Sequence, residues 1–250
     1  MECTRALIVF ARYPELGQTK TRLAASLGDV DTLQLYEAML ADTAWSAGLV
    51  ANCLHLAALT GLPKDGSRPR DPMGRSPFSP FLLSEQQGDE FGARLGAAME
   101  LAVSAAGGPA LLVGADSPEI STELLERAFV CLEEHDVVLG PAPDGGYYLI
   151  GMQSYYPSLF ENINWSTETV AAETEAAAHA LGLSTTRLEA LSDLDYLEDL
   201  RNLAIRRRHA LAIAGGPSPC PATDSWLRGA LPGQNGIPPR LTEGGTDDPI

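Results

Sequence analysis

The sequence predicts a single α/β domain with a mostly parallel central sheet and helices on both faces. The chain has 250 residues, of which 45% are hydrophobic, enough to bury a sizeable core. Short apolar runs alternate with stretches in which apolar residues recur at helical spacing. The first run, residues 6–10, reads ALIVF, which is typical of a strand buried on both faces. Strands that alternate with helices form βαβ units, and these units build a parallel sheet.

The predicted elements follow one another along most of the chain. The helix at residues 33–45 places Leu35, Met39 and Leu40 on one face, after the suitable cap Asp31. The last two strands are too close together for a helical crossover, which predicts a local antiparallel or irregular departure from the parallel sheet. The strands are expected at residues 6–10, 54–59, 81–83, 110–113, 137–139 and 147–150, and the other helices at 91–105, 121–134, 167–181 and 196–208.

Two segments lack this alternation. Residues 61–80 hold three glycines and five prolines, which predicts a surface loop. Residues 215–250 hold seven glycines and seven prolines and show little periodicity, which predicts a flexible tail. We therefore expect a folded domain over residues 1–214 and a tail over residues 215–250.

Composition excludes several classes of protein. The 33 acidic residues outnumber the 17 Lys and Arg, which gives a formal charge of −16. Such a chain repels a phosphate backbone, so a nucleic-acid reader is not expected. No apolar run approaches the roughly 20 residues that span a bilayer, and the first run lacks a signal-peptide cleavage site. These features predict a cytoplasmic protein. The four cysteines and four histidines are scattered, so any metal would be held by oxygen atoms.

The loop after the first strand is the strongest candidate for a binding site. It carries Arg12, Lys20, Thr21 and Arg22, and it leads into a helix. In an open α/β sheet, ligands bind beyond the carboxyl ends of the strands. Cations and backbone N–H groups at a helix start bind anions, and phosphate is the expected guest. The alternative is that Lys20 and Arg22 are solvated surface charges, although a cation is unfavourable at a helix start.

Acidic residues follow two later strands. Asp116 follows the strand at 110–113. A carboxylate there could hold Mg²⁺ or Mn²⁺ against a diphosphate, or it could simply form a turn. After the next strand, Asp144 precedes Gly145 and Gly146, which would let a ligand approach the backbone closely. The ring of Tyr147 could then stack on a base or a sugar.

A last acidic pair stands just before the final helix. Asp193 and Asp195 are two residues apart, so in extended structure they share one face. Taken alone, they are consistent with either a ligand site or a helix cap.

These residues belong to motifs whose order resembles the bacterial DUF2064 family over about residues 5–205. That family is assigned to the GT-A-type glycosyltransferases of the nucleotide-diphospho-sugar transferase superfamily, so the resemblance implies a GT-A-like, Rossmann-like fold. The motifs are FAR at 10–12, KTRL at 20–23, GADSP at 114–118, GPAPDGGYYLIG at 140–151, WST at 165–167 and DLD at 193–195.

The resemblance implies a metal-dependent transferase that uses a nucleoside-diphosphate sugar and a small-molecule acceptor. Mg²⁺ or Mn²⁺ would be held by Asp116, Asp193 and Asp195. Lys20 and Asp144 are then the candidate catalytic residues, with Asp144 as the base for the acceptor. The expected nucleotide- and substrate-binding residues are Arg12, Lys20, Thr21, Arg22, Gly145, Gly146, Tyr147, Trp165 and Thr167.

Two alternatives remain. Related guanylyltransferases have a similar Lys-x-Arg-Leu start, so the same cations could grip a nucleoside triphosphate, with pyrophosphate as the leaving group. The chain could also bind a nucleotide sugar without turning it over. A released nucleoside diphosphate, released pyrophosphate, or neither would distinguish these hypotheses.

Overall fold

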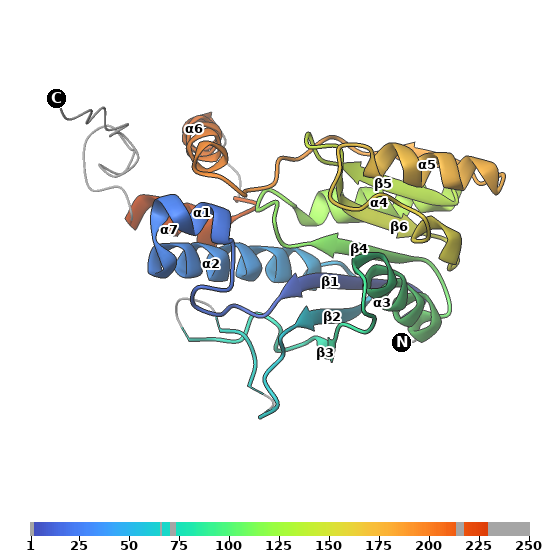
Figure 1. Cartoon of the computed structure of the whole chain (residues 1–250), viewed down its shortest axis with the longest axis horizontal. Coiled ribbons are helices and arrows are strands. Elements are labelled where there is room, and N and C mark those ends of the chain that lie inside the picture. The colour runs from blue at the N-terminus through green and yellow to red at the C-terminus, as the bar shows by residue number, and fades with distance from the viewer. Residues whose placement is uncertain (1–2, 66, 71–73, 214–217, 230–250) are drawn as a thin grey trace.

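A computed structural model describes residues 3–65, 67–70, 74–213 and 218–229, and it contains one seven-stranded sheet (Figure 1). The strand order is β3-β2-β1-β4-β6-β5-β7. The strands are β1 (Ala6–Arg12), β2 (Leu54–Thr60), β3 (Leu82–Glu85), β4 (Ala110–Gly114), β5 (Val137–Pro141), β6 (Tyr147–Met152) and β7 (Thr185–Arg187).

Strand directions agree with the sequence prediction. β1 pairs in parallel with both β2 and β4, with Ile8 opposite Leu56 on one side and Leu112 on the other. β6 alone runs antiparallel to its two neighbours, β4 and β5. The short connection between β5 and β6 leaves no room for a helical crossover, which is why β6 reverses direction.

Helices cover both faces of the sheet. On one face α2 (Asp29–Gly48) packs against β1, with Leu7 and Val9 in the shared core, and α4 (Thr122–Glu134) packs against β4, β5 and β6. On the other face α3 (Phe91–Ala106) packs against β1, with Ile8 in the shared core, and α5 (Val170–Ala180) packs against β5 and β7. The α/β class with a mostly parallel sheet is therefore confirmed. None of the described helices is long and apolar enough to cross a membrane.

A third apolar cluster lies beyond the sheet, at the side where the pocket residues gather. It joins α1 (Thr21–Leu27), α2, α6 (Leu197–Ile213) and α7 (Pro221–Gly229), through residues such as Leu23, Leu35, Leu203 and Leu227. Figure 1 shows these helices together beside the sheet. Leu194 belongs to the same cluster, so the cluster anchors the segment that carries Asp193 and Asp195.

Besides α7, two short elements were not predicted from the sequence: the strand β7 and the 3₁₀ turn η1 (Pro157–Leu159). Each spans three residues, too few for a period to be visible. α1 begins at Thr21, where the sequence indicated a helix start beside Lys20 and Arg22. Residues 61–80 contain no helix or strand among their described positions, in agreement with the predicted loop, but Phe78 within that loop is fully buried.

The boundary expected at residue 214 differs from the structure. Residues 221–229 form α7, which packs on α2, and Leu227 is buried there. The Asp42 carboxylate on α2 accepts hydrogen bonds from the backbone N–H groups of Ala222 and Thr223, at 2.8 and 2.7 Å. Packed chain therefore extends through Gly229, although the segment is rich in Gly and Pro. The rest of the expected tail, residues 215–217 and 230–250, lies outside the described residues.

Candidate functional site

A cavity of about 820 Å³ opens at the carboxyl ends of β1 and β4. This is the edge at which a parallel α/β sheet binds its ligands. Two residues expected in the site, Gly145 and Asp193, do not line the cavity. The expected residues that do line it are Arg12, Lys20, Thr21, Arg22, Asp116, Asp144, Gly146, Tyr147, Trp165, Thr167 and Asp195.

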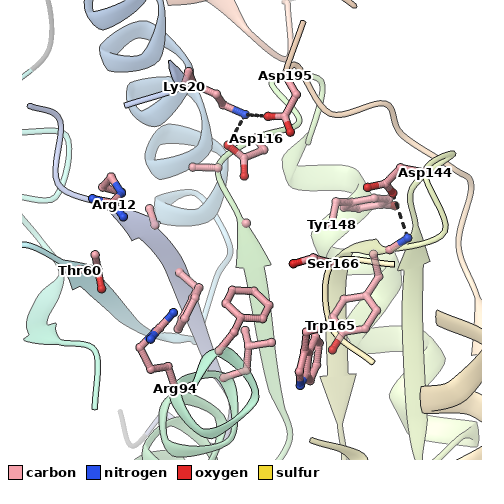
Figure 2. A pocket seen from close by; sticks show the side chains of 18 of the residues that line it. Arg12, Lys20, Thr60, Arg94, Asp116, Asp144, Tyr148, Trp165, Ser166 and Asp195 are labelled. Carbon is pink, nitrogen blue, oxygen red and sulfur yellow. Dashed lines mark hydrogen bonds and ion pairs between the residues drawn. The ribbon is translucent and has the colours of Figure 1, made fainter. Parts of the chain in front are cut away.

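Lys20 joins two carboxylates that are far apart in the sequence. Its Nζ lies 2.6 Å from Oδ1 of Asp116 and 2.7 Å from Oδ1 of Asp195 (Figure 2). The Lys20 side chain is 7% exposed, whereas Asp116 and Asp195 are 57% and 34% exposed. We call these three residues the Lys20 cluster. It places one positive and two negative charges on the wall of the cavity.

Backbone structure brings the Lys20 cluster together. Lys20 precedes α1 in the left-handed conformation, with φ of 49°, which is strained for a residue with a side chain. The backbone N–H of Leu194 donates to the carbonyl oxygen of Asp116 at 3.0 Å. This bond ties the segment before α6 to the end of β4, so Asp195 meets Asp116 across about 80 residues of chain.

Charge and burial shift the pKa values of two residues here. Burial alone would lower the pKa of Lys20, but the charges of Asp116 and Asp195 outweigh it and raise the pKa above its ordinary value. Lys20 therefore stays protonated. Burial, together with the negative charges of Asp144 and Asp195, raises the pKa of Asp193 to about 6. Asp193 thus lies close enough to both carboxylates to respond to their charge, although it does not line the cavity.

The donor set suits a divalent cation in part. Asp116 and Asp195 approach the same nitrogen, so one ion could reach both, and Mg²⁺ commonly takes one or two carboxylates together with substrate phosphates. The expected third ligand, Asp193, does not join them: within the described ranges no three His, Cys, Asp or Glu residues are grouped as a metal site. The residues present therefore fit an ion that phosphate oxygens complete, with Lys20 beside it.

Asp144 faces the cavity from the turn between β5 and β6. It is exposed, and its Oδ1 accepts a hydrogen bond from the backbone N–H of Gly146 at 2.9 Å. Gly145 faces away: with φ of 90°, a Cβ there would meet the carbonyl oxygen of Glu168 at 2.0 Å. The glycine is therefore required for packing of the turn against the start of α5, and a contact with the ligand is not needed to explain it.

Aromatic side chains form one wall of the cavity, which we call the aromatic wall. The ring of Trp165 makes edge contacts with Phe91 and Tyr147, with centroids 5.2 and 6.4 Å apart. Phe91 in turn contacts Phe10 at 6.0 Å. These are favourable aromatic geometries, so the wall is rigid and gives an apolar surface against which a sugar or a base could pack.

Three expected binding residues have local structural tasks as well. Thr167 Oγ1 donates to the carbonyl oxygen of Asn164 at 2.6 Å, which closes the turn before α5. Arg22 lies 3.5 Å from Oδ2 of Asp195 and over the ring of Tyr196 at 5.5 Å. Thr21 is the first residue of α1.

The sequence prediction missed several residues that line the cavity. They include Thr60, the last residue of β2, and Gln86, which follows the edge strand β3. The argument that ligands bind beyond the ends of strands was applied to other strands only. Applied to β2 and β3 as well, it would have found both residues. Ser166 lies inside the WST motif with φ of 65°, and Arg94 stands in the first turn of α3. A cation at a helix start was the signal used for Lys20, and it applies equally to Arg94.

Comparisons with known proteins agree with this architecture. Residues 64–167 match the model of the DUF2064 family, which is described as "uncharacterized protein conserved in bacteria". The resemblance inferred from the sequence motifs is thus confirmed. No curated protein is significantly similar to the chain.

Two solved structures illustrate the fold. A "putative nucleotide-diphospho-sugar transferase" from Desulfovibrio desulfuricans G20 is 28% identical, with a TM-score of 0.76, and the match covers 90% of this chain and 94% of that one. The 4-diphosphocytidyl-2C-methyl-D-erythritol synthase of Anaerococcus prevotii DSM 20548 is 8% identical, with a TM-score of 0.51, over 82% of this chain and 99% of that one. The second likeness concerns the fold alone. The chain has the fold of nucleotide-diphospho-sugar transferase-like proteins.

Proposed function

We propose that the chain is a metal-dependent transferase that moves a sugar from a nucleoside diphosphate to a small-molecule acceptor. The observation that carries this proposal is the Lys20 cluster at the carboxyl end of β4, with Asp144 facing the same cavity from a separate turn. The Lys20 cluster suits a diphosphate, and the Asp144 carboxylate suits a hydroxyl that must lose a proton. The nucleotide-diphospho-sugar transferase-like fold of the chain supports the same reading.

In the proposed reaction, the bond between the anomeric carbon of the sugar and the diphosphate oxygen breaks. A bond from the anomeric carbon to the acceptor oxygen forms, and a nucleoside diphosphate leaves. Lys20 stabilises the negative charge that grows on the leaving diphosphate, because its ammonium group is positioned before the reaction begins. Arg22 and Arg12, at the rim of the cavity, add charge from the exposed side.

Asp116 and Asp195 would hold the divalent cation, Mg²⁺ or Mn²⁺, with Asp193 behind them. When bound, the cation supplies positive charge at the diphosphate. Both carboxylates could bind the cation and keep their ion pairs with Lys20, since each has a second oxygen and both are partly exposed. Without a cation the two negative charges of these carboxylates cancel the two positive charges of Lys20 and Arg22, so the bound ion would supply the net positive charge that a diphosphate needs.

Asp144 would accept the proton of the acceptor hydroxyl. It is the exposed carboxylate on the β5–β6 turn, and the bond from the Gly146 N–H fixes one of its oxygens. The other oxygen is left for the proton. The aromatic wall of Tyr147 and Trp165 lies below it and would exclude water from the anomeric carbon.

Product analysis tests this proposal against its rivals. We expect the full chain with Mn²⁺ to release nucleoside diphosphate from at least one nucleotide sugar in the presence of an acceptor library. Release of pyrophosphate from a nucleoside triphosphate would instead support nucleotidyl transfer. Binding without either product would indicate a binding protein. A thermal-shift panel with nucleotides finds the right ligand first, since a ligand at a hundredfold its Kd stabilises a protein by about 2.7 kcal/mol.

The Asp116→Asn variant tests the metal. We expect it to lose the gain in nucleotide affinity that Mn²⁺ gives the parent, because an amide oxygen is a weaker ligand than a carboxylate. Asp136→Asn is a matched control, since Asp136 is a carboxylate that pairs with Ser184, away from the cavity. An Asp116→Asn variant that keeps the full Mn²⁺ effect would contradict the metal assignment.

A further inference from the structure

Arg94 occupies a position in the cavity that the stability of the fold does not explain. It lies in the first turn of α3, where the positive end of the helix dipole makes a cation unfavourable. Within the described residues, no carboxylate oxygen lies at ion-pair distance from it, although Asp89 and Glu90 are close in sequence. Lys20, another cation of the cavity, has two carboxylate partners, whereas Arg94 is half-buried and has none in the described part of the chain. Arg94 therefore keeps its donors for something else.

The Arg94 side chain is held in place. Its Nη1 donates to the carbonyl oxygen of Asp89 at 3.0 Å, and its guanidinium carbon lies 5.9 Å from the centre of the Phe91 ring. Figure 2 shows the guanidinium group reaching into the cavity from below, toward the side where Thr60 and Arg12 lie. A planar group that is fixed on one side presents its remaining N–H donors in a defined plane.

On the side of the cavity toward which Arg94 points (Figure 2), hydrogen bonds join the ends of β1, β2 and β3. The Gln86 side chain donates to the carbonyl oxygens of Ala11 and Ala58 at 2.8 and 3.2 Å, and its oxygen accepts from the Thr60 hydroxyl at 3.1 Å. Gln86 has therefore used its donors on the protein. Thr60 has donated its only proton, so its oxygen can only accept. Arg94 brings donors to this side of the cavity, and so does Arg12, which lies opposite Thr60 in the pairing of β1 with β2. Of the two, Arg94 is the one whose guanidinium group is held by Asp89 and Phe91.

The proposed function decides which part of a substrate reaches Arg94. The diphosphate would lie at the Lys20 cluster and the acceptor at Asp144, so the nucleoside is the part left for the side of the cavity with Arg94 and Thr60. Resting on that proposed function, we propose that Arg94 recognises the nucleobase and selects bases that present two neighbouring acceptor atoms, as guanine and cytosine do.

The chemistry of the bases supports this selection. Guanine presents O6 and N7 side by side, and arginine binds this pair with two parallel hydrogen bonds. Cytosine presents O2 and N3 in the same way. In adenine a donor stands beside N7, and in uracil the N–H at position 3 separates the two carbonyl groups. Both guanine and cytosine also carry an amino group, which an acceptor such as the Thr60 oxygen complements.

Calorimetric titration of the full chain with GDP, CDP, UDP, ADP and inorganic pyrophosphate tests the proposal. We expect GDP or CDP to bind at least about tenfold more tightly than UDP and ADP, the discrimination typical of one bidentate arginine contact. Arg94→Ala should remove this preference and leave pyrophosphate affinity unchanged. Arg94→Lys keeps the charge but loses the fork, and it should also lose the preference. Arg127→Ala, which removes an arginine paired with Glu189 outside the cavity, is the control and should behave like the parent.

Each other outcome overturns the proposal in a distinct way. If the parent binds the four nucleotides equally, or if Arg94→Ala keeps the preference, Arg94 does not read the base and the transferase proposal still stands. If Arg94→Ala weakens pyrophosphate as strongly as GDP, the residue is a phosphate ligand. If the parent binds neither nucleotides nor pyrophosphate, the proposed function fails together with the inference. Thermal melting of both Arg94 variants shows whether each one is folded.

Discussion

Two clusters of side chains link distant parts of this chain, and each contains both positive and negative charges. They differ in how far these charges are exposed to solvent. The Lys20 cluster opens on the cavity, and its carboxylates are 57% and 34% exposed. The second cluster, Arg207 with Asp224 and Ser218, lies between α6 and α7. There the Arg207 and Asp224 side chains are 7% and 1% exposed.

In the Arg207 cluster, the charged groups bond to each other and are buried. Arg207 Nε and Nη2 donate to the two oxygens of Asp224, each at 2.9 Å, and the Ser218 hydroxyl donates to Asp224 at 2.6 Å. Burial alone would raise the pKa of Asp224, but these bonds outweigh it and lower the pKa below its ordinary value. Both oxygens of Asp224 are therefore used within the protein. The two clusters differ in that the proposed functional one has partly exposed carboxylates, whereas the charges of the other one are buried.

Asp224→Ala gives the largest effect that the comparison predicts. It leaves the Arg207 guanidinium buried without its main partner, which typically costs about 3–5 kcal/mol. We expect the free energy of unfolding in urea to fall by about 3 kcal/mol, since Ser218 and Glu119 still lie near Arg207. Nucleotide binding by the folded protein should not change.

Arg206→Ala is the control for Asp224→Ala. Arg206 lies on the same helix as Arg207 and forms an ion pair with Glu119 at 2.8 Å. The Arg206 side chain is 41% exposed. An exposed pair contributes at most about 1 kcal/mol. If both variants lose the same small amount of stability, α7 is not docked by its buried ion pair, and the contrast between the two clusters disappears.

Lys20→Ala is predicted to have the opposite profile. The transfer rate should fall by about a hundredfold or more, as when a positioned group that stabilises a leaving oxyanion is removed. The free energy of unfolding should change little, because Asp116 and Asp195 can be hydrated once the lysine is gone. Initial rates and urea unfolding measured on the same preparation separate the two effects.

Arg22→Ala sharpens that result. Its side chain is 66% exposed and contacts Asp195 at 3.5 Å, so water screens much of its charge. We expect a loss of rate clearly smaller than for Lys20→Ala. Equal losses would mean that burial of the lysine is not what matters in the Lys20 cluster.

The sequence predicted the part of this architecture that depends on local patterns. Continuous apolar runs located β1 and β4, and the helix expected at 121–134 is α4, where the Ser121 side chain accepts from the Leu124 N–H at 3.2 Å. The strand-end rule then placed Lys20 and Asp116 at one edge of the sheet. Both residues lie on the cavity wall.

Other features depend on contacts between distant segments, which no local pattern contains. The expected ligand Asp193 does not line the cavity, whereas Asp195 two residues later does, and the bond from Leu194 to Asp116 that holds this segment at the end of β4 joins residues far apart in the chain. Residues 218–229 read as tail because Gly and Pro interrupt any period, yet α7 docks through Asp42 and Arg207, whose partners stand far away in the chain. The role of Gly145 likewise depends on Glu168, which the sequence does not place beside it.

The pH dependence of stability gives the smallest predicted effect and concerns how α7 is held. Burial raises the pKa of Asp42 to about 6, against an ordinary value of 3.8, although the N–H groups of Thr223 and Ala222 at the start of α7 favour the charged form. Because the folded pKa is the higher one, the native state holds a proton there that the unfolded state has lost between about pH 4 and 6. Asp42 therefore contributes stability at low pH that disappears as the pH rises through about 6.

The measurement is the difference between the parent and Asp42→Asn across the pH range. From pH 5 to 7.5 the parent should lose about 1 kcal/mol of unfolding free energy relative to the variant, from a shift of about two pKa units. The absolute stability of the variant is not the readout, since an amide offers one acceptor to the two N–H groups instead of two. Parallel curves for the two proteins would mean that α7 holds Asp42 charged throughout. In that case Asp42 would be a carboxylate anion over the whole pH range, and it would accept the hydrogen bonds from the first N–H groups of α7 in that charged form.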